Sequence, residues 1–135
     1  MRKLNEYEIE ALAIEVRQFL LDNSLWVDVA IYFNGKAFCT SDENGKCYCN
    51  DPNHLLVLES KDPRNYLEFC GDLFIAEPHV FSMIFEGGFC GCMSFYYEYG
   101  VAFDNRTEKE FSDILKKYGL YYKHDQHWNL RCYYL

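Results

Sequence analysis

The stretch that most constrains the fold of this chain covers residues 79–99, with the sequence HVFSMIFEGGFCGCMSFYYEY. Two apolar runs flank Gly87 and Gly88, and a pair of glycines supplies the positive φ angles that a two-residue hairpin turn requires. Pairing across such a turn places Phe85 opposite Cys90. Both faces of the two strands are then apolar, so the sequence predicts a central hairpin that is covered on both sides.

Two helices are predicted outside this stretch. Asn5 begins a capping box, and apolar residues recur behind it at helical spacing, which predicts a helix over residues 5–22. Thr107 begins a second capping box and predicts a helix over residues 107–118. Lysines in its last turn suit the helix dipole, and Gly119 suits its C-terminal end.

Two Asn-Gly pairs, at residues 34–35 and 44–45, are signals for type I′ hairpin turns and predict a meander of three strands. The register of the second turn places Asp42 opposite Cys47. With that register the side chains of Cys47 and Cys49 face the core, on the side that the N-terminal helix covers.

The remaining segments complete an α+β fold. Residues 55–59 form a short apolar run that predicts a strand, and Asp62-Pro63 predicts a short helix over residues 63–70. Residues 120–134 predict a C-terminal hairpin whose last strand has one apolar face and one wet face, with Asn129, Arg131 and Tyr133 on the wet side. The predicted fold is one α+β domain over residues 1–135, an antiparallel sheet of about six or seven strands packed by two main helices.

The charge of the chain limits its partners. It carries 21 acidic and 13 basic residues, a formal net charge of −8. A surface of this sign repels phosphates, so direct binding to nucleic acid is not expected. It favours instead a protein partner with a basic surface.

The leading functional prediction is therefore a non-catalytic, cytoplasmic interaction protein that acts as an inhibitor. Aromatic residues make up 19% of the chain, and exposed tyrosines beside acids are typical of protein-binding surfaces. The most specific hypothesis rests on composition alone: a phage or mobile-element anti-defence protein of anti-CRISPR or anti-restriction type, a DNA mimic that occludes a basic groove. The candidate partner-binding residues are Glu6, Glu10, Asp28, Asp42, Glu43, Tyr96, Glu98, Tyr99 and Asp104. Alternatively, part of the apolar surface is a homodimer interface, with the C-terminal strand as the pairing edge.

The seven cysteines suggest an alternative function. No secretory leader or membrane-spanning run of about 18 apolar residues is recognised, so reduced thiols in the cytoplasm are expected. One pattern, C-x7-C-x-C-x4-H, joins Cys39, Cys47, Cys49 and His54 with residue types that bind zinc, although the spacing is not that of common zinc knuckles. The alternative is a small zinc-binding or Cys-dependent domain built on two C-x-C pairs, Cys47 with Cys49 and Cys90 with Cys92.

Packing in the core is the simpler role for these thiols, because free cysteine is among the most buried residue types. No metal and no cofactor is therefore assigned from the sequence. The chain has no nucleophile elbow, zinc-protease helix or phosphate-binding loop, so no enzyme activity is predicted. A small enzyme with a Cys–His pair is a third hypothesis.

Overall fold

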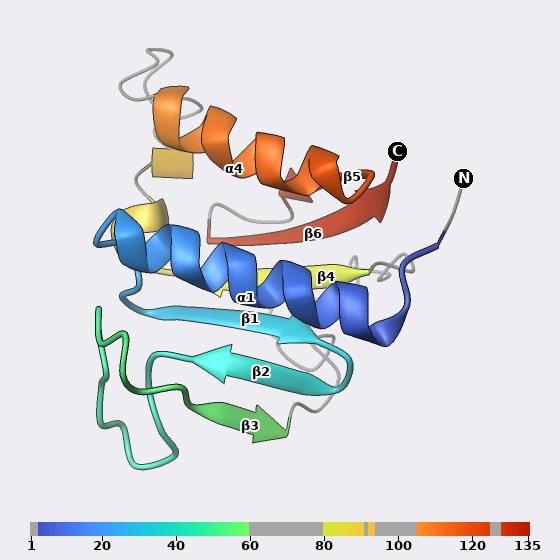
Figure 1. The fold of residues 1–135 in the computed structure, drawn as a ribbon. Coiled ribbons are helices and arrows are strands. Elements are labelled where there is room, and N and C mark those ends of the chain that lie inside the picture. The colour runs from blue at the N-terminus through green and yellow to red at the C-terminus, as the bar shows by residue number, and fades with distance from the viewer. Residues whose placement is uncertain (1–2, 60–79, 91, 94–104, 125–127) are drawn as a thin grey trace, which may run out of the picture.

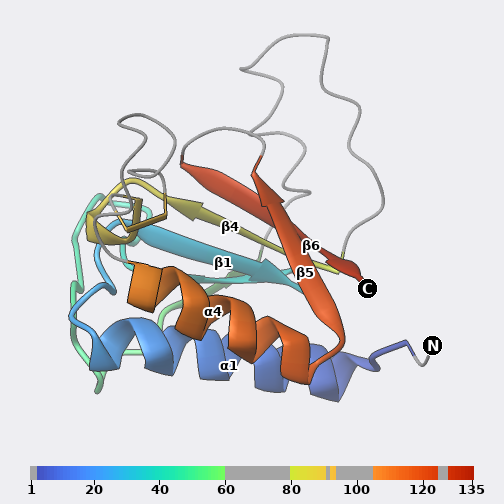
Figure 2. The same cartoon turned by 90° about the horizontal axis from the view of Figure 1, so that it is seen from above.

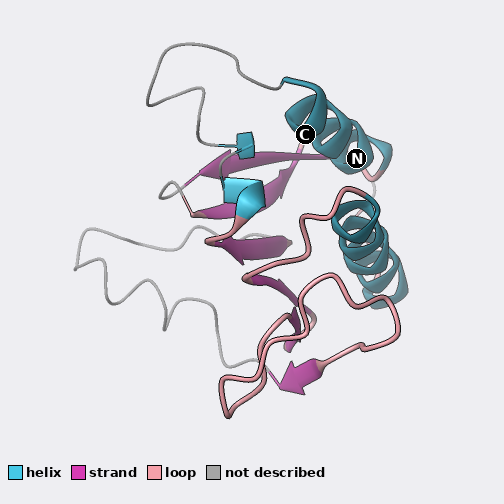
Figure 3. Ribbon diagram, turned by 90° about the vertical axis from the view of Figure 1, so that its left-hand side faces the viewer, coloured by secondary structure: helices cyan, strands magenta, loops and turns pink. Residues whose placement is uncertain are grey.

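The structure, a computed structural model, describes residues 3–59, 80–90, 92–93, 105–124 and 128–135. Its elements are α1 (Glu6–Asp22), β1 (Val29–Phe33), β2 (Lys36–Cys39), β3 (Val57–Glu59), β4 (Phe81–Phe85), α4 (Asn105–Lys117), β5 (Leu120–His124) and β6 (Asn129–Tyr134). The six strands form one antiparallel sheet in the order β3-β2-β1-β4-β6-β5. Both α1 and α4 lie on the same face of this sheet (Figures 1, 2 and 3). The predicted α+β class is confirmed.

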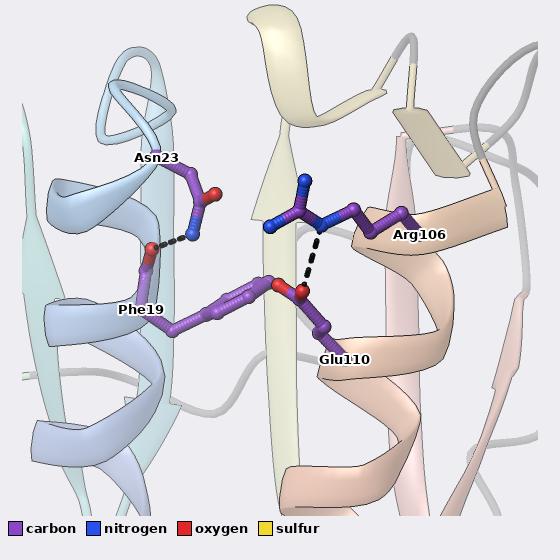
Figure 4. Close-up of polar contacts among 4 residues, drawn as sticks. All are labelled: Phe19, Asn23, Arg106 and Glu110. Carbon is purple, nitrogen blue, oxygen red and sulfur yellow. Dashed lines mark hydrogen bonds and ion pairs between the residues drawn. The ribbon is translucent and has the colours of Figure 1, made fainter.

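The predicted N-terminal helix is confirmed as α1. The side chain of Asn5 accepts a hydrogen bond from the backbone N–H of Glu8 at 2.9 Å, and the Glu8 carboxylate accepts one from the Asn5 N–H at 3.2 Å. At the other end, the side-chain amide of Asn23 donates to the carbonyl of Phe19 at 2.7 Å (Figure 4). The inner face of α1 buries Leu12, Ala13, Val16 and Leu20 against the sheet.

The first Asn-Gly turn is also confirmed. Phe33 pairs with Lys36, and Asn34 and Gly35 between them have φ angles of 49° and 73°. Positive φ at both central residues is what a type I′ turn requires. The core-facing residues of β1 and β2, among them Ile31, are buried as predicted.

The second turn has a different register from the predicted one. Gly45 has a φ of 80° and donates its N–H to the carbonyl of Asp42, and Ser41 rather than Asp42 pairs with Cys47. These features describe a loop of three residues, one longer than the predicted turn. A shift of one residue moves alternate side chains to the other face, so Cys47 and Cys49 are exposed and not in the core.

The third strand of the meander is β3 and not the segment after the second turn. Glu59 pairs with Lys36, and Val57 pairs with Phe38. The strand predicted for residues 55–59 thus forms over its last three residues, and it makes one edge of the sheet. The predicted helix at 63–70 lies outside the described residues.

The apolar strand before the two glycines is central, as predicted. β4 pairs with β1 on one side and with β6 on the other, and its residues Phe81, Met83 and Phe85 are buried toward the helices. The predicted hairpin is wrong, because residues 88–90 and 92–93 are helical. Phe85 therefore faces β1, and its predicted pairing with Cys90 does not form.

The position of Gly87 explains the error. A Cβ atom at this residue would lie 2.3 Å from the carbonyl oxygen of Val27, so only glycine allows the two backbones to approach this closely. The N–H of Cys90, three residues further on, donates to the Gly87 carbonyl at 3.0 Å. This bond lies at the start of the helical segment. Gly87 therefore permits a close contact between two backbone segments and is not part of a hairpin turn.

Aromatic rings connect the helices to the sheet. The ring of Phe111, on α4, lies 6.5 Å from that of Phe19 on α1, 5.3 Å from that of Phe89 and 5.6 Å from that of Tyr122. Figure 4 shows the Phe19 side chain reaching from α1 toward α4. The helix begins at residue 105, so the predicted N-cap at Thr107 is wrong, and Thr107 is 8% exposed within the first turn.

The C-terminal hairpin forms, but its last strand differs from the prediction in two ways. Asn129 and Arg131, expected on a wet face, are 4% and 3% exposed. β6 also lies inside the sheet, between β4 and β5, so the C-terminal strand is not a free pairing edge. An internal strand has neighbours on both sides, which buries residues that the alternating pattern alone assigns to solvent.

Candidate functional site

The candidate acidic residues within the described part of the chain fall into two groups, at opposite ends of β1. Glu6 and Glu10 lie beside the β1–β2 turn: the side-chain amide of Asn34 donates to the Glu6 carbonyl at 2.8 Å, and Lys36 lies 3.9 Å from the Glu10 carboxylate. Asp28 directly precedes β1 at its other end.

Asp42 and Glu43, in the second turn, differ from each other. The Asp42 carboxylate accepts hydrogen bonds from the N–H groups of Asn44 and Lys46, each at 2.9 Å, so it stabilises the turn. Glu43 is exposed at the tip. The remaining candidates, Tyr96, Glu98, Tyr99 and Asp104, lie outside the described residues.

The outward face of α1 combines acidic and apolar side chains. Tyr7 is 82% exposed and Ile14 is 52% exposed, and these two residues are seven positions apart, which places them on one face of the helix. Glu10 lies between them on the same side. Helical periodicity identifies the inner apolar stripe of this helix, so the sequence does not predict these two exposed apolar residues.

Arg17, the basic residue of α1, is held by contacts with residues 26 and 54. Arg17 donates to the carbonyl of His54 at 3.0 Å and lies 5.6 Å from the centre of the Trp26 ring. Desolvation lowers the pKa of Arg17, and the nearby charge of Asp51 opposes this shift. Arg17 is seven positions after Glu10, on the same side of α1, but its guanidinium is held by these contacts, and Lys36 lies beside Glu10. The outward face of α1 therefore combines apolar and acidic side chains with two cations that already have partners.

A second constellation lies at the other end of β1. Asp28, Cys47 and Cys49 each offer one ligand atom, and these three atoms all lie within 4.8 Å of one another. Cys47 is paired with Ser41 and Cys49 begins a turn, and the two side chains lie close together. The N–H of Tyr48, between them, donates to the Thr40 carbonyl at 2.7 Å and fixes this orientation.

The backbone around this cluster is held by a double hydrogen bond. The N–H of Trp26 donates to the side-chain oxygen of Asn50 at 3.0 Å, and the Asn50 N–H donates back to the Trp26 carbonyl at 2.8 Å. Asp28 and Asn50 both have left-handed backbone angles, with φ of 53° and 55°. The Asp28 carbonyl also accepts from the N–H of Glu86 at 3.0 Å. The Trp26–Asn50 bonds join residues 26–28 to the segment that carries the two thiols, and the Asp28–Glu86 bond joins them to the end of β4.

The electrostatics of the cluster disfavour a second negative charge. Desolvation raises the pKa of the Cys49 thiol, the backbone N–H of Asp28 opposes this, and the charges of Cys47 and Asp28 raise the pKa further. The hydroxyl of Ser41 lies 3.6 Å from the Cys47 sulfur. A cation between the three groups would offset this repulsion.

The four-residue zinc pattern predicted from the sequence does not assemble. Cys39 lies on β2, opposite the helix-facing side, and burial raises the pKa of its thiol. The ring of His54 stacks on that of Tyr48, with centres 3.7 Å apart and planes 8° from parallel. Across the residues that the structure describes, Asp28, Cys47 and Cys49 are the one group of three such ligands within reach of one another. The two C-x-C pairs therefore do not meet.

Comparison with protein-family models, with curated proteins and with solved structures gives no significant match. Within the described ranges, neither helix combines the length and the apolar character needed to cross a bilayer. The candidate sites therefore depend on the geometry of this chain alone.

The buried thiol of Cys132 gives a pH-dependent prediction. Cys132 is 0% exposed, and burial strongly raises the pKa of its thiol. The same thiol in the unfolded chain ionises above about pH 8.5, so the unfolded state binds fewer protons and stability falls as the pH rises. From pH 8 to pH 10 this one group removes about 2 kcal/mol from the free energy of unfolding.

Denaturant unfolding at both pH values, for the wild type and for Cys132→Ala, measures this contribution. The variant is expected to lose about 2 kcal/mol less than the wild type between pH 8 and pH 10, although it is less stable at pH 8. Equal losses for the two proteins would show that Cys132 ionises similarly in the folded and unfolded states.

Proposed function

We propose that this protein is a non-catalytic interaction protein that binds a partner with a basic surface through the outward face of α1. The observation that supports this proposal is the combination of Tyr7, 82% exposed, and Ile14, 52% exposed, with Glu6 and Glu10 on the same helix. The charge of Arg17 is directed elsewhere, to the carbonyl of His54.

Each kind of side chain has a distinct role in this proposal. Exposed aromatic residues supply a large contact area, and a few such anchors carry most of the affinity in protein interfaces. Carboxylates around them steer a basic partner and select against acidic ones. The net charge of −8 adds a long-range attraction to a basic partner.

The most specific form of the proposal is an inhibitor made by a phage or mobile element that occludes the nucleic-acid-binding groove of a host defence nuclease. Occlusion of such a groove needs no catalysis, only an acidic body that competes with phosphates for the same lysines and arginines. The acidic composition and the acidic α1 face support this form. The distribution of Glu6 and Asp28 to opposite ends of β1 favours contact through α1 over mimicry along the whole chain.

Affinity capture from nuclease-treated bacterial lysate, at low and at high salt, tests the proposal. The expected result is a retained nucleic-acid-handling protein that leaves at high salt, because exposed charge pairs are screened. Loss of an anchoring side chain typically costs about 2 kcal/mol or more, so Tyr7→Ala with Ile14→Ala should reduce binding at low salt about 30-fold.

Matched variants separate this site from general charge. Glu6→Gln with Glu10→Gln removes two charges from the α1 face, and Asp113→Asn with Glu59→Gln removes two charges elsewhere. The first pair is expected to weaken capture, and to reduce its dependence on salt, more than the second pair does. Capture that responds equally to both pairs, or to neither, contradicts a site on α1.

A further inference from the structure

We propose that Asp28, Cys47 and Cys49 form a binding site for a thiophilic divalent cation of the zinc class, with a fourth coordination position open to water or to a donor from another molecule. The site lies at the end of β1 away from the β1–β2 turn, and it does not depend on the interaction proposed for α1.

The distances suit such an ion. Tetrahedral zinc has Zn–S distances of about 2.3 Å, which place two thiolate ligands about 3.8 Å apart. The three ligand atoms of the cluster already lie within 4.8 Å of one another. Small side-chain rotations therefore bring the three atoms into contact with one ion, without a change in the backbone.

The backbone holds the three ligands in place before an ion binds. The Tyr48 N–H bond to Thr40 orients the two cysteines, and the reciprocal bonds between Trp26 and Asn50 fix the neighbouring chain. Asp28 is fixed by its own carbonyl, which accepts from Glu86. Ligands that are already oriented lose less conformational freedom on binding, which favours tight coordination.

The ligand types select the class of ion. Two thiolates and one carboxylate match the sulfur and oxygen ligands that zinc accepts, whereas calcium and magnesium prefer oxygen alone. With three protein ligands, the site has the open form of zinc centres and not the closed form of four-ligand structural sites. All three residues are exposed, so a donor from another molecule has access to the fourth position.

Titration of the reduced, metal-free full chain with Co²⁺ and Zn²⁺ tests this site. Tetrahedral Co²⁺ bound by thiolates gives visible d–d bands and a near-ultraviolet charge-transfer band, and Zn²⁺ should abolish both at a ratio of one ion per chain. Cys47→Ser and Cys49→Ser should each weaken Zn²⁺ binding at least 100-fold, since loss of an outer-shell partner alone costs about 10–100-fold.

The third ligand needs a variant that keeps the backbone. Asparagine tolerates the left-handed angle of residue 28 as aspartate does, so Asp28→Asn changes the charge and leaves the local conformation. This variant should keep the thiolate band while binding Zn²⁺ at least about 10-fold more weakly. Circular dichroism of each metal-free variant should match that of the wild type.

Two controls separate this cluster from the zinc pattern of the sequence. Cys39→Ser and His54→Ala alter the residues of that pattern that lie outside the cluster, and both should bind Zn²⁺ as the wild type does. The proposal is overturned if the wild type shows no thiolate band with Co²⁺. It is equally overturned if folded Cys47→Ser and Cys49→Ser bind Zn²⁺ with wild-type affinity.

Discussion

Replacement of Phe111 by alanine is expected to lower the free energy of unfolding by about 3–5 kcal/mol, the usual cost of truncating a buried Phe. Phe111 is 0% exposed, and its ring meets those of Phe19, Phe89 and Tyr122. These three residues belong to different parts of the chain, so the cavity would weaken the attachment of α4 to all of them. Such a loss is a large fraction of the 5–15 kcal/mol that typically separates folded from unfolded domains.

Denaturant unfolding measures this effect, with Tyr7→Ala as the matched control. Tyr7 is an aromatic residue on the other helix but is 82% exposed, so its truncation should change stability by no more than about 0.5 kcal/mol. A similar small change for Phe111→Ala would mean that α4 is not held by these rings.

Replacement of Gly87 by alanine is expected to destabilise the protein by about 2–3 kcal/mol. The added Cβ would lie 2.3 Å from the carbonyl oxygen of Val27 and 3.1 Å from its carbonyl carbon, and a backbone group cannot rotate away as a side chain can. The segment from Val27 to Asp28 would have to move away from the end of β4.

The adjacent glycine provides the control for this experiment. A Cβ at Gly88 would lie 3.2 Å from a terminal methyl group of Leu25, which can shift, and the residue is helical, where alanine is favoured over glycine. Gly88→Ala should therefore stay within about 1 kcal/mol of the wild type in thermal or denaturant unfolding. Two glycines in a true hairpin turn would instead both resist substitution, so equal large losses would favour the hairpin predicted from the sequence.

The parts of the fold that the sequence predicts correctly are those set by local chemistry. The capping box at Asn5, the type I′ turn at Asn34 and the helix end at Gly119 each depend on residues a few positions apart. The α+β class follows from the same local signals. In these cases the nearest neighbours in the chain are also the neighbours in space.

The errors arise where a distant segment decides the outcome. Gly87 looks like a turn residue until Val27 is placed against it, and Arg131 looks exposed until β6 is placed inside the sheet. The sequence predicts a second turn that is one residue too short, and this places Cys47 and Cys49 on the wrong face. These errors share a cause, because tertiary contacts override local preference.

The candidate sites were predictable only in part. Cys47 and Cys49 were recognised as a pair by their spacing, but their partner Asp28 is about twenty residues away and had been assigned to an acidic surface. The exposed Tyr7 was missed because a period of 3.6 residues identifies the buried face of a helix more readily than an exposed apolar residue.

The central position of β4 has a consequence for how the chain folds. Its Met83 pairs with Ile31 on one side and with Leu130 on the other, and each partner is more than forty residues away in sequence. The β1–β2 and β5–β6 hairpins close over short loops, whereas the sheet becomes continuous only when β4 enters between them. Pairing between such distant residues has a high entropic cost, so we expect insertion of β4 to limit the folding rate and the hairpins to form earlier.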